Sequence, residues 1–388
     1  MQHRVLTVVI LLAASLFVSA EAPDSSFDPS LYSSKTDPGG LVVHEWGTFT
    51  SVAAENGSAV EWVPQLGPSE LPCFVDRASI NAKGWLPATV RMETPVLYFY
   101  SAVDRTVDVR IRFRRGAVTE WFPKAEVVPR AVEPLTLRIP TLEGTIAWKQ
   151  VKVQPRAAED YPEGKSNHYF AARKTDASPV LVGEQREKFL FYRGVGNFAV
   201  PVSARLLEDG RVAVTASSGR AVGDVMLFQN TKGTITAQPA QSQAGELTLT
   251  PPSTATTAKA VRATLERMLV EHGLYAKEAA AMVETWRDSW FEEGARVFYV
   301  VPQAAVDEIL PLEVTPAPQN VARVFVGRIE LITPAILEEV HNALQNRDRA
   351  TVLKYGRFLR PILAQLNEGP ELLQFAYSTV SPPLGGCR

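Results

Sequence analysis

Residues 41–51, with the sequence LVVHEWGTFTS, place an imidazole, a carboxylate and an indole side by side as His44, Glu45 and Trp46. The run begins like the zinc-protease motif H-E-x-x-H, but its fifth position is Thr48, so that motif is absent. The segment is typical of a strand, in which His44 and Glu45 point to opposite faces. A metal-assisted or acid–base site therefore needs further side chains that meet these two in space.

Glu93, in the segment RMETP before the apolar run VLYFY, is the third candidate catalytic residue. With His44 and Glu45 it could supply the base and the acid of a hydrolase. Other side chains that such a site could recruit are Glu61, Asp76 and His168. The competing interpretation is structural: a hydrogen-bonded histidine at a sheet margin, and an ion pair of Glu93 with Arg91 where a strand enters the core.

The dipeptide Glu-Trp occurs three times, at residues 45–46, 61–62 and 120–121. Carboxylates beside exposed aromatic faces hold sugar rings, because the ring stacks on the indole and its hydroxyls donate to the carboxylate. We therefore predict Trp46, Trp62 and Trp121 as residues that bind a polysaccharide. The alternative is strand alternation, with each tryptophan in the core and each glutamate on the outer face.

Arg110, Arg112 and Arg114 recur at every second position and form a basic stripe on one face of a strand. Such a stripe is a candidate binding surface for an anion such as an acidic polysaccharide. The alternative is a solvated sheet face that resists edge-to-edge aggregation.

The segment WRDSWFEE offers a candidate protein-interaction surface in Trp286, Arg287, Asp288 and Trp290. The two tryptophans are four residues apart and share one face of a helix. The alternative is an apolar stripe that docks this helix on the β domain.

Several classes of cofactor and partner lack their sequence signals. There is no P-loop, no G-x-S-x-G elbow and no C-x-x-C pair, and Gly194-Val195-Gly196 lacks the third glycine of a dinucleotide motif, so no nucleotide cofactor is expected. The sequence leaves open a divalent metal ion as a cofactor. The 40 basic and 42 acidic residues give a net charge of -2, which argues against nucleic acid as the main partner.

The N-terminus predicts export to the periplasm or the extracellular space. Residues 1–20 read as a signal peptide, with Arg4 before an apolar run at 5–18 and Ala20 at the cleavage site. That run is shorter than the roughly 20 residues of a membrane span, and no span is expected in the mature chain. Cys73 and Cys387, the only cysteines, either pair in that oxidising compartment or remain thiols.

We expect an α+β protein in which an antiparallel, sandwich-like β domain at 41–250 follows a disordered linker at 21–40. The clearest strand is 106–114, where apolar and charged residues alternate. Further strands are expected at 91–101, 135–139, 145–153, 189–192, 202–207 and 211–216.

A smaller, helix-rich α+β domain is expected at 253–372, with a tail at 373–388. Its first helix is capped by Ser253 or Thr254 and runs to 272, and a second spans 276–293. Thr333 and Asp348 cap two more helices, the last of which Pro361 should kink or end. Strands at 296–301 and 321–332 either form their own sheet or complete the first one.

Five segments carry a likeness to known sequences: VVHEWGTFTS, TVRMETPVLYFYS, TEWFP, EAAAMVETWRDSWFEEGARVFYVVP and RVFVGRIELITP. Together they resemble a group of exported bacterial proteins with no assigned activity. The resemblance implies a bacterial envelope or secreted protein and brings no binding residue with it. Three hypotheses follow: a binding or accessory protein for polysaccharide or another envelope component, a hydrolase with or without a metal, and a structural interaction module.

Overall fold

The structure, a computed structural model, describes residues 40–63, 71–78, 86–130, 141–164, 168–217 and 219–380. The predicted signal peptide, the predicted linker up to residue 39 and the strand expected at 135–139 lie outside the described residues, as does Cys387. Cys73 is disulfide-bonded. Within the described part, every helix is too short or too polar to cross a membrane.

Strands make up most of the described chain. They are β1 (Val42–Val52), β2 (Asp76–Arg77), β3 (Val90–Tyr100), β4 (Arg105–Arg114), β5 (Gly116–Phe122), β6 (Glu126–Val128), β7 (Glu143–Val153), β8 (Val180–Val182), β9 (Gln185–Glu187), β10 (Leu190–Gly196), β11 (Val202–Leu206), β12 (Val212–Ala216), β13 (Gly223–Thr231), β14 (Thr234–Ser242), β15 (Glu246–Leu249), β16 (Gly294–Val301), β17 (Leu312–Thr315) and β18 (Asn320–Leu331). The expected strands of the described part are among them, each within a few residues of its predicted bounds.

Apart from the short helix η3, the described helices lie in the last third of the chain. They are η3 (His168–Arg173), α2 (Ala258–Glu271), α3 (Ala276–Thr285), α4 (Arg287–Trp290), α5 (Gln303–Ile309), α6 (Pro334–Gln345), α7 (Arg349–Lys354), η4 (Gly356–Phe358), α8 (Leu359–Leu366) and α9 (Pro370–Val380). We refer to α6, α7, η4, α8 and α9 as the helical module. Residues 373–380, assigned above to a tail, are helical instead.

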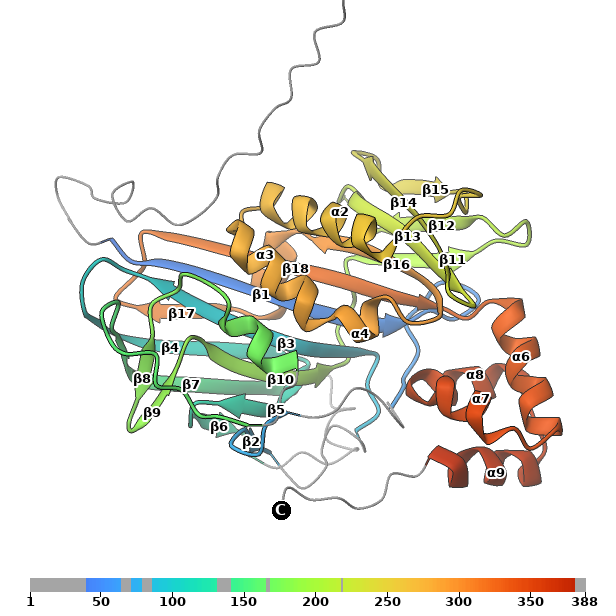
Figure 1. Cartoon of the computed structure of the whole chain (residues 1–388), viewed down its shortest axis with the longest axis horizontal. Coiled ribbons are helices and arrows are strands. Elements are labelled where there is room, and N and C mark those ends of the chain that lie inside the picture. The colour runs from blue at the N-terminus through green and yellow to red at the C-terminus, as the bar shows by residue number, and fades with distance from the viewer. Residues whose placement is uncertain are drawn as a thin grey trace, which may run out of the picture.

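One large sheet organises the molecule (Figure 1). Among the described residues it has 15 strands, and its main order is β14-β13-β16-β18-β1-β3-β10-β5-β7-β4-β17. A second sheet joins β11, β12 and β15. The protein is therefore mixed α+β, with most strands in one large sheet and a smaller helical part at the C-terminal end.

Strand β1 lies in the middle of this sheet, between β3 and β18. It pairs antiparallel with β3 but parallel with β18, from Val42 opposite Asn320 to Val52 opposite Glu330. The predicted antiparallel pairing is thus present between β1 and β3, while the C-terminal strand β18 adds a parallel pair at the centre of the sheet. A parallel pair needs a crossover connection, and here most of the chain forms it. Of the two arrangements left open for the C-terminal strands, β16 and β18 complete the N-terminal sheet.

The two faces of the sheet are covered differently. On one face, helices α2, α3 and α4 with η3 pack on a cluster of aromatic and aliphatic side chains that includes Trp46, Tyr98 and Phe298 (Figure 1). On the other face, side chains of β1 and β3 pack with those of β4, β7, β11 and β12. The helical module has an apolar cluster of its own, centred on Val340, Leu344 and Leu359.

Local sequence signals explain most helix boundaries. Thr333 and Asp348 cap α6 and α7, as predicted. Thr257, and not Ser253 or Thr254, caps α2. The helix expected at 276–293 is interrupted at residue 286, where α3 ends and α4 begins. Pro361 lies in the first turn of α8, where its missing N–H costs no hydrogen bond, so the prediction that it ends or kinks the helix is wrong.

Candidate functional site: an arginine-rich end of the central sheet

His44 lies on the helix-covered face of the sheet and belongs to a closed, buried network. Its Nδ1 lies 2.8 Å from Oε2 of Glu278 on α3. The Tyr100 hydroxyl donates to Glu278 Oε1 at 2.7 Å, and the Tyr275 backbone N–H donates to Oε2 at 2.8 Å. This network fastens α3 to β1, so His44 acts here as a structural partner of Glu278.

Glu45 points to the opposite face, as the strand geometry predicts. The Tyr192 hydroxyl donates to its Oε1 at 2.5 Å, and Arg323 Nε donates to its Oε2 at 2.6 Å. Arg323 also donates through Nη1 to Asp307 at 2.8 Å. Burial, and after it the charge of Glu45, raises the pKa of Tyr192 well above its ordinary value, which keeps the hydroxyl protonated and donating. Both oxygens of Glu45 are therefore occupied.

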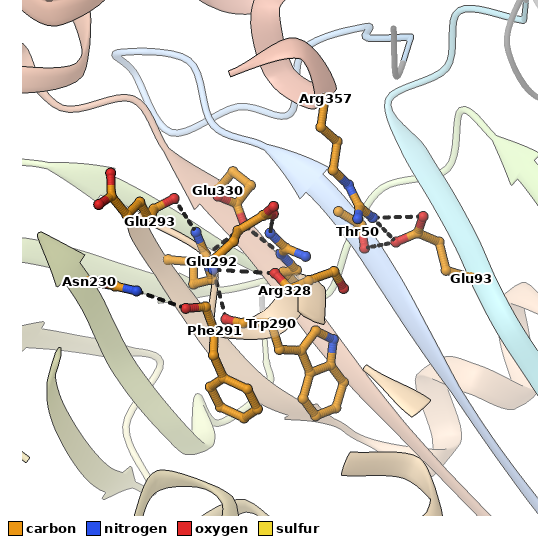
Figure 2. A network of polar contacts seen from close by, with 12 residues as sticks. Thr50, Glu93, Asn230, Trp290, Phe291, Glu292, Glu293, Arg328, Glu330 and Arg357 are labelled. Carbon is orange, nitrogen blue, oxygen red and sulfur yellow. Dashed lines mark hydrogen bonds and ion pairs between the residues drawn. The ribbon is translucent and has the colours of Figure 1, made fainter. Parts of the chain in front are cut away.

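Glu93 lies in a third network, at the junction with the helical module (Figure 2). Thr50 Oγ1 donates to its Oε2 at 2.7 Å, and Arg357 Nη2 donates to both of its oxygens, at 2.8 and 2.7 Å. The three predicted catalytic residues thus lie in three separate networks and do not converge. The described residues include no group of three or more His, Cys, Asp and Glu side chains placed to hold a metal ion. His168 instead contacts Asp288, at 2.8 Å.

The three predicted sugar-binding tryptophans are buried, each 3% exposed or less. Trp46 packs in the aromatic cluster under the helices, Trp121 packs on the opposite face, and Trp62 lies 5.2 Å from the ring of Phe358. Placing them as a stacking surface for polysaccharide is therefore wrong, because no indole face reaches solvent. The alternative is confirmed for the tryptophans, which lie in the core, and for Glu61, which is exposed, but Glu45 and Glu120 are buried as well.

The basic stripe of β4 lies on a solvated face, beside the edge strand β17. Arg112 Nη2 is 3.1 Å and Arg110 Nη1 is 3.9 Å from Glu313 on that strand, while Arg114 is exposed. Exposed pairs of this kind contribute about 0–1 kcal/mol to stability. Glu313 thus partly neutralises the positive charge of the stripe.

The Trp286–Trp290 segment divides between core and surface. Both indoles are buried, with nearly parallel rings whose centroids are 6.3 Å apart, and both belong to the aromatic cluster. They hold the helix on the sheet and cannot form the predicted interaction surface. Arg287 and Asp288 remain exposed, and Arg287 pairs with Glu284.

The structure also brings a set of arginines together at one end of the helix-covered face. No sequence motif indicated this set. We call it the arginine row, and it comprises Arg296 on β16, Arg328 on β18, Arg91 on β3, Arg193 on β10 and Arg357 on η4. The strand register connects them, because Arg328 lies opposite Thr50, and Thr50 lies opposite Arg91. The sequence signal was the presence of single charges inside otherwise apolar strands, as in VRMETPVLYFY and GARVFYVV.

Arg328 and Arg296 form the buried core of this row and share one carboxylate (Figure 2). Both pair through Nε with Glu330, Arg296 at 3.0 Å, and Arg328 Nη2 donates to Glu292 at 2.7 Å. Arg296 Nη1 also donates to the backbone carbonyl of Trp290 at 2.7 Å, which links the row to the end of α4.

The row retains hydrogen-bond donors beyond those it uses. Arg328 Nη1 and Arg357 Nε have no hydrogen-bond partner among the described residues, although these residues are 0% and 7% exposed. Guanidinium groups bind oxyanions through charge-assisted hydrogen bonds.

The pKa values of the row reflect burial and the neighbouring charges. Burial lowers the pKa of Arg91 and of Arg296 to about 10, against the opposing effect of nearby glutamates. Burial alone would raise the pKa of Glu292, but the charges of Arg328, Arg357 and Arg296 outweigh it and hold that pKa below its ordinary value. Glu292 is therefore ionised at neutral pH.

No family model matches this sequence, and no curated protein matches it. Among solved structures, it is similar to the zebrafish (Danio rerio) Fcho1 Mu homology domain with bound Eps15 peptide, at 8% identity and a TM-score of 0.31, over 76% of this chain and 97% of that chain. It is also similar to the yeast delta-COP-I mu-homology domain, at 7% identity and a TM-score of 0.27, over 76% of this chain and 98% of that chain.

Proposed function

We propose that this protein is an exported binding or accessory protein that holds a polysaccharide or another envelope component at the arginine row. The observation that carries the proposal is the unpaired donors of Arg328 and Arg357 in a buried cluster of arginines. His44, Glu45 and Glu93, which a hydrolase would need together, each have their own structural partners. Binding therefore accounts for more of this geometry than hydrolysis does.

Two observations support export to the periplasm or the extracellular space. The first 20 residues have the charge, apolar run and small residues of a signal peptide. Cys73 is disulfide-bonded, and structural disulfides are rare in the reducing cytosol.

We also propose that the β part serves as a rigid, sandwich-like platform for this binding. Apolar side chains of β4 and β7 share one core cluster with those of β1 and β3, which supports two packed layers. Sites built on packed strands are held more accurately than sites on loops. The arginine row lies on four such strands, and η4 supplies its remaining arginine.

The proposal is tested by incubating the folded protein with a panel of envelope and acidic polysaccharides. Retardation in a polysaccharide-containing native gel measures binding, and chromatography of the incubated polymer measures cleavage. We expect retardation without shortened chains. Cleavage products, or one equivalent of zinc or manganese that is lost in His44→Ala while the fold persists, would overturn the proposal in favour of a hydrolase.

A further inference from the structure

We propose that Arg328 and Arg357 together bind an oxyanion, such as the carboxylate of a uronate or a sulfate ester in an acidic polysaccharide. This inference rests on the proposed binding function and names the chemical group that the protein recognises.

The two guanidinium groups both lie near the Phe358 ring, although they come from different elements of the chain. The Arg328 guanidinium carbon is 5.4 Å, and that of Arg357 is 5.5 Å, from the centroid of the same Phe358 ring. Thr50 connects them further, because it lies opposite Arg328 in the sheet and donates to Glu93, the partner of Arg357. Figure 2 shows the Arg357–Glu93 pair beside the Arg328 network.

Each arginine keeps one donor group beyond its ion pairs. Arg328 uses Nε and Nη2 for Glu330 and Glu292, which leaves Nη1. Arg357 uses Nη2 for both oxygens of Glu93, which leaves Nε. A buried donor without a partner costs about 1–3 kcal/mol, and an oxyanion with two or more acceptor oxygens would satisfy both donors at once.

Charge selects the class of ligand. Both unpaired donors belong to guanidinium groups, which are positively charged and donate charge-assisted hydrogen bonds to oxyanions. A neutral sugar would not gain from that charge.

Partly exposed polar side chains lie next to the buried row. Glu292 and Glu293, which follow α4, and Lys354 at the end of α7 have side chains that are 29%, 30% and 30% exposed. Glu292 joins this partly exposed group to Arg328, which donates to it at 2.7 Å.

Calorimetric titration of the whole folded protein tests the inference with defined probes: sodium glucuronate, sodium sulfate, polygalacturonate, and glucose and dextran as neutral controls. We expect one binding site for glucuronate or sulfate, tighter binding of polygalacturonate, and none of glucose. Comparison of glucuronate with sulfate separates carboxylate from sulfate recognition. Binding should weaken as salt is added.

Two variants localise the site. Arg357→Lys keeps a positive charge facing Glu93 but removes the Nε donor, and we expect about a tenfold or larger loss of affinity. Arg110→Lys, on the exposed stripe, is the matched control and should leave affinity unchanged. In the unaltered protein, the Nε–H nuclear magnetic resonance signal of Arg357 should shift when glucuronate is added. This measurement does not require a variant to fold.

The outcomes separate this inference from the proposed function. Equal binding of polygalacturonate and dextran, with no shift of the Arg357 signal, would overturn the oxyanion inference and leave a binding protein. Glucuronate binding that Arg357→Lys weakens, without binding of any polysaccharide, would support the oxyanion site and contradict the polysaccharide proposal. Binding that Arg110→Lys weakens and Arg357→Lys does not would place the site on the β4 stripe and overturn the inference.

Discussion

The same face of the same sheet carries two chemically opposite regions. At one end, Trp46, Tyr98 and Phe298 pack under α2, α3 and α4. At the other end, the strands that supply these aromatic residues supply Arg91, Arg296 and Thr50. The pairing of β1 with β3 is irregular between the two regions. The regions also differ in what covers them: apolar helix faces in one case, and Glu292, Glu293 and η4 in the other.

This contrast separates stability from recognition. Burial of apolar area stabilises the aromatic end, and little of that apolar surface is accessible to a ligand. The arginine end buries charges, which is costly unless every charge is paired, and buried ion pairs often add no net stability over apolar packing. A region that is costly to bury and leaves donors unpaired is the better candidate for binding.

The largest effect is expected at the aromatic end. Trp46→Ala removes a fully buried indole and leaves a cavity, so we expect a loss of about 3–5 kcal/mol in the free energy of unfolding, measured by urea denaturation. Val103→Ala, at a residue 45% exposed, is the control and should change it by less than about 0.5 kcal/mol. A small effect of Trp46→Ala would show that the aromatic end does not carry the stability.

The next effect is expected where the arginine end meets the helical module. Glu93→Gln leaves the buried Arg357 without its charged partner, and we expect a loss of about 3 kcal/mol. The double variant Glu93→Gln/Arg357→Gln should lose less than the sum of the two single variants, as determined in a double-mutant cycle by urea denaturation. Simple additivity would mean that the two side chains do not interact.

A smaller, pH-dependent effect is expected at Glu292. Its pKa in the folded protein lies below the ordinary 4.5, so below that pH the unfolded chain binds more protons and the folded state loses stability. The stability advantage over Glu292→Gln should therefore be full near pH 7 and shrink at about pH 4 and below. Urea denaturation of both proteins across this pH range measures it, and a difference independent of pH would contradict the assigned ionisation.

The smallest effect is expected on the solvated stripe of β4. Arg110→Gln removes a long, exposed contact to Glu313 and should change the free energy of unfolding by less than about 0.5 kcal/mol. If Arg110→Gln lowered the free energy of unfolding as much as Glu93→Gln does, exposed and buried charges would contribute similarly to stability. That result would contradict the comparison of the two regions.

Local chemistry made part of the fold predictable. The alternation at 106–114 matches β4 within one residue, and the caps at Thr333 and Asp348 mark the starts of α6 and α7. The β13–β14 hairpin was not predicted, although its turn contains Lys232 and Gly233 in left-handed conformations. Pro239 within β14 weakens the strand signal, because proline cannot donate to a sheet.

The candidate site was less predictable, since single residues were identified without their partners. His44 and Glu45 were correctly placed on opposite faces, but Glu278, 234 residues away from His44, was not foreseen as its partner. Glu45 and Arg323 lie directly opposite each other in the parallel pair of β1 and β18. No local pattern reports such a register, because it depends on which distant strand arrives beside β1.

The sequence by itself determined the alternation of strands, the main helix caps and the mixed α+β class of the fold. Only the tertiary structure decided that the tryptophans are core residues, that β16 and β18 join the N-terminal sheet, and that five separate arginines form one row. The physical reason is that periodicity is set by neighbours in the chain, whereas burial and pairing are set by long-range register and by the elements that cover each face.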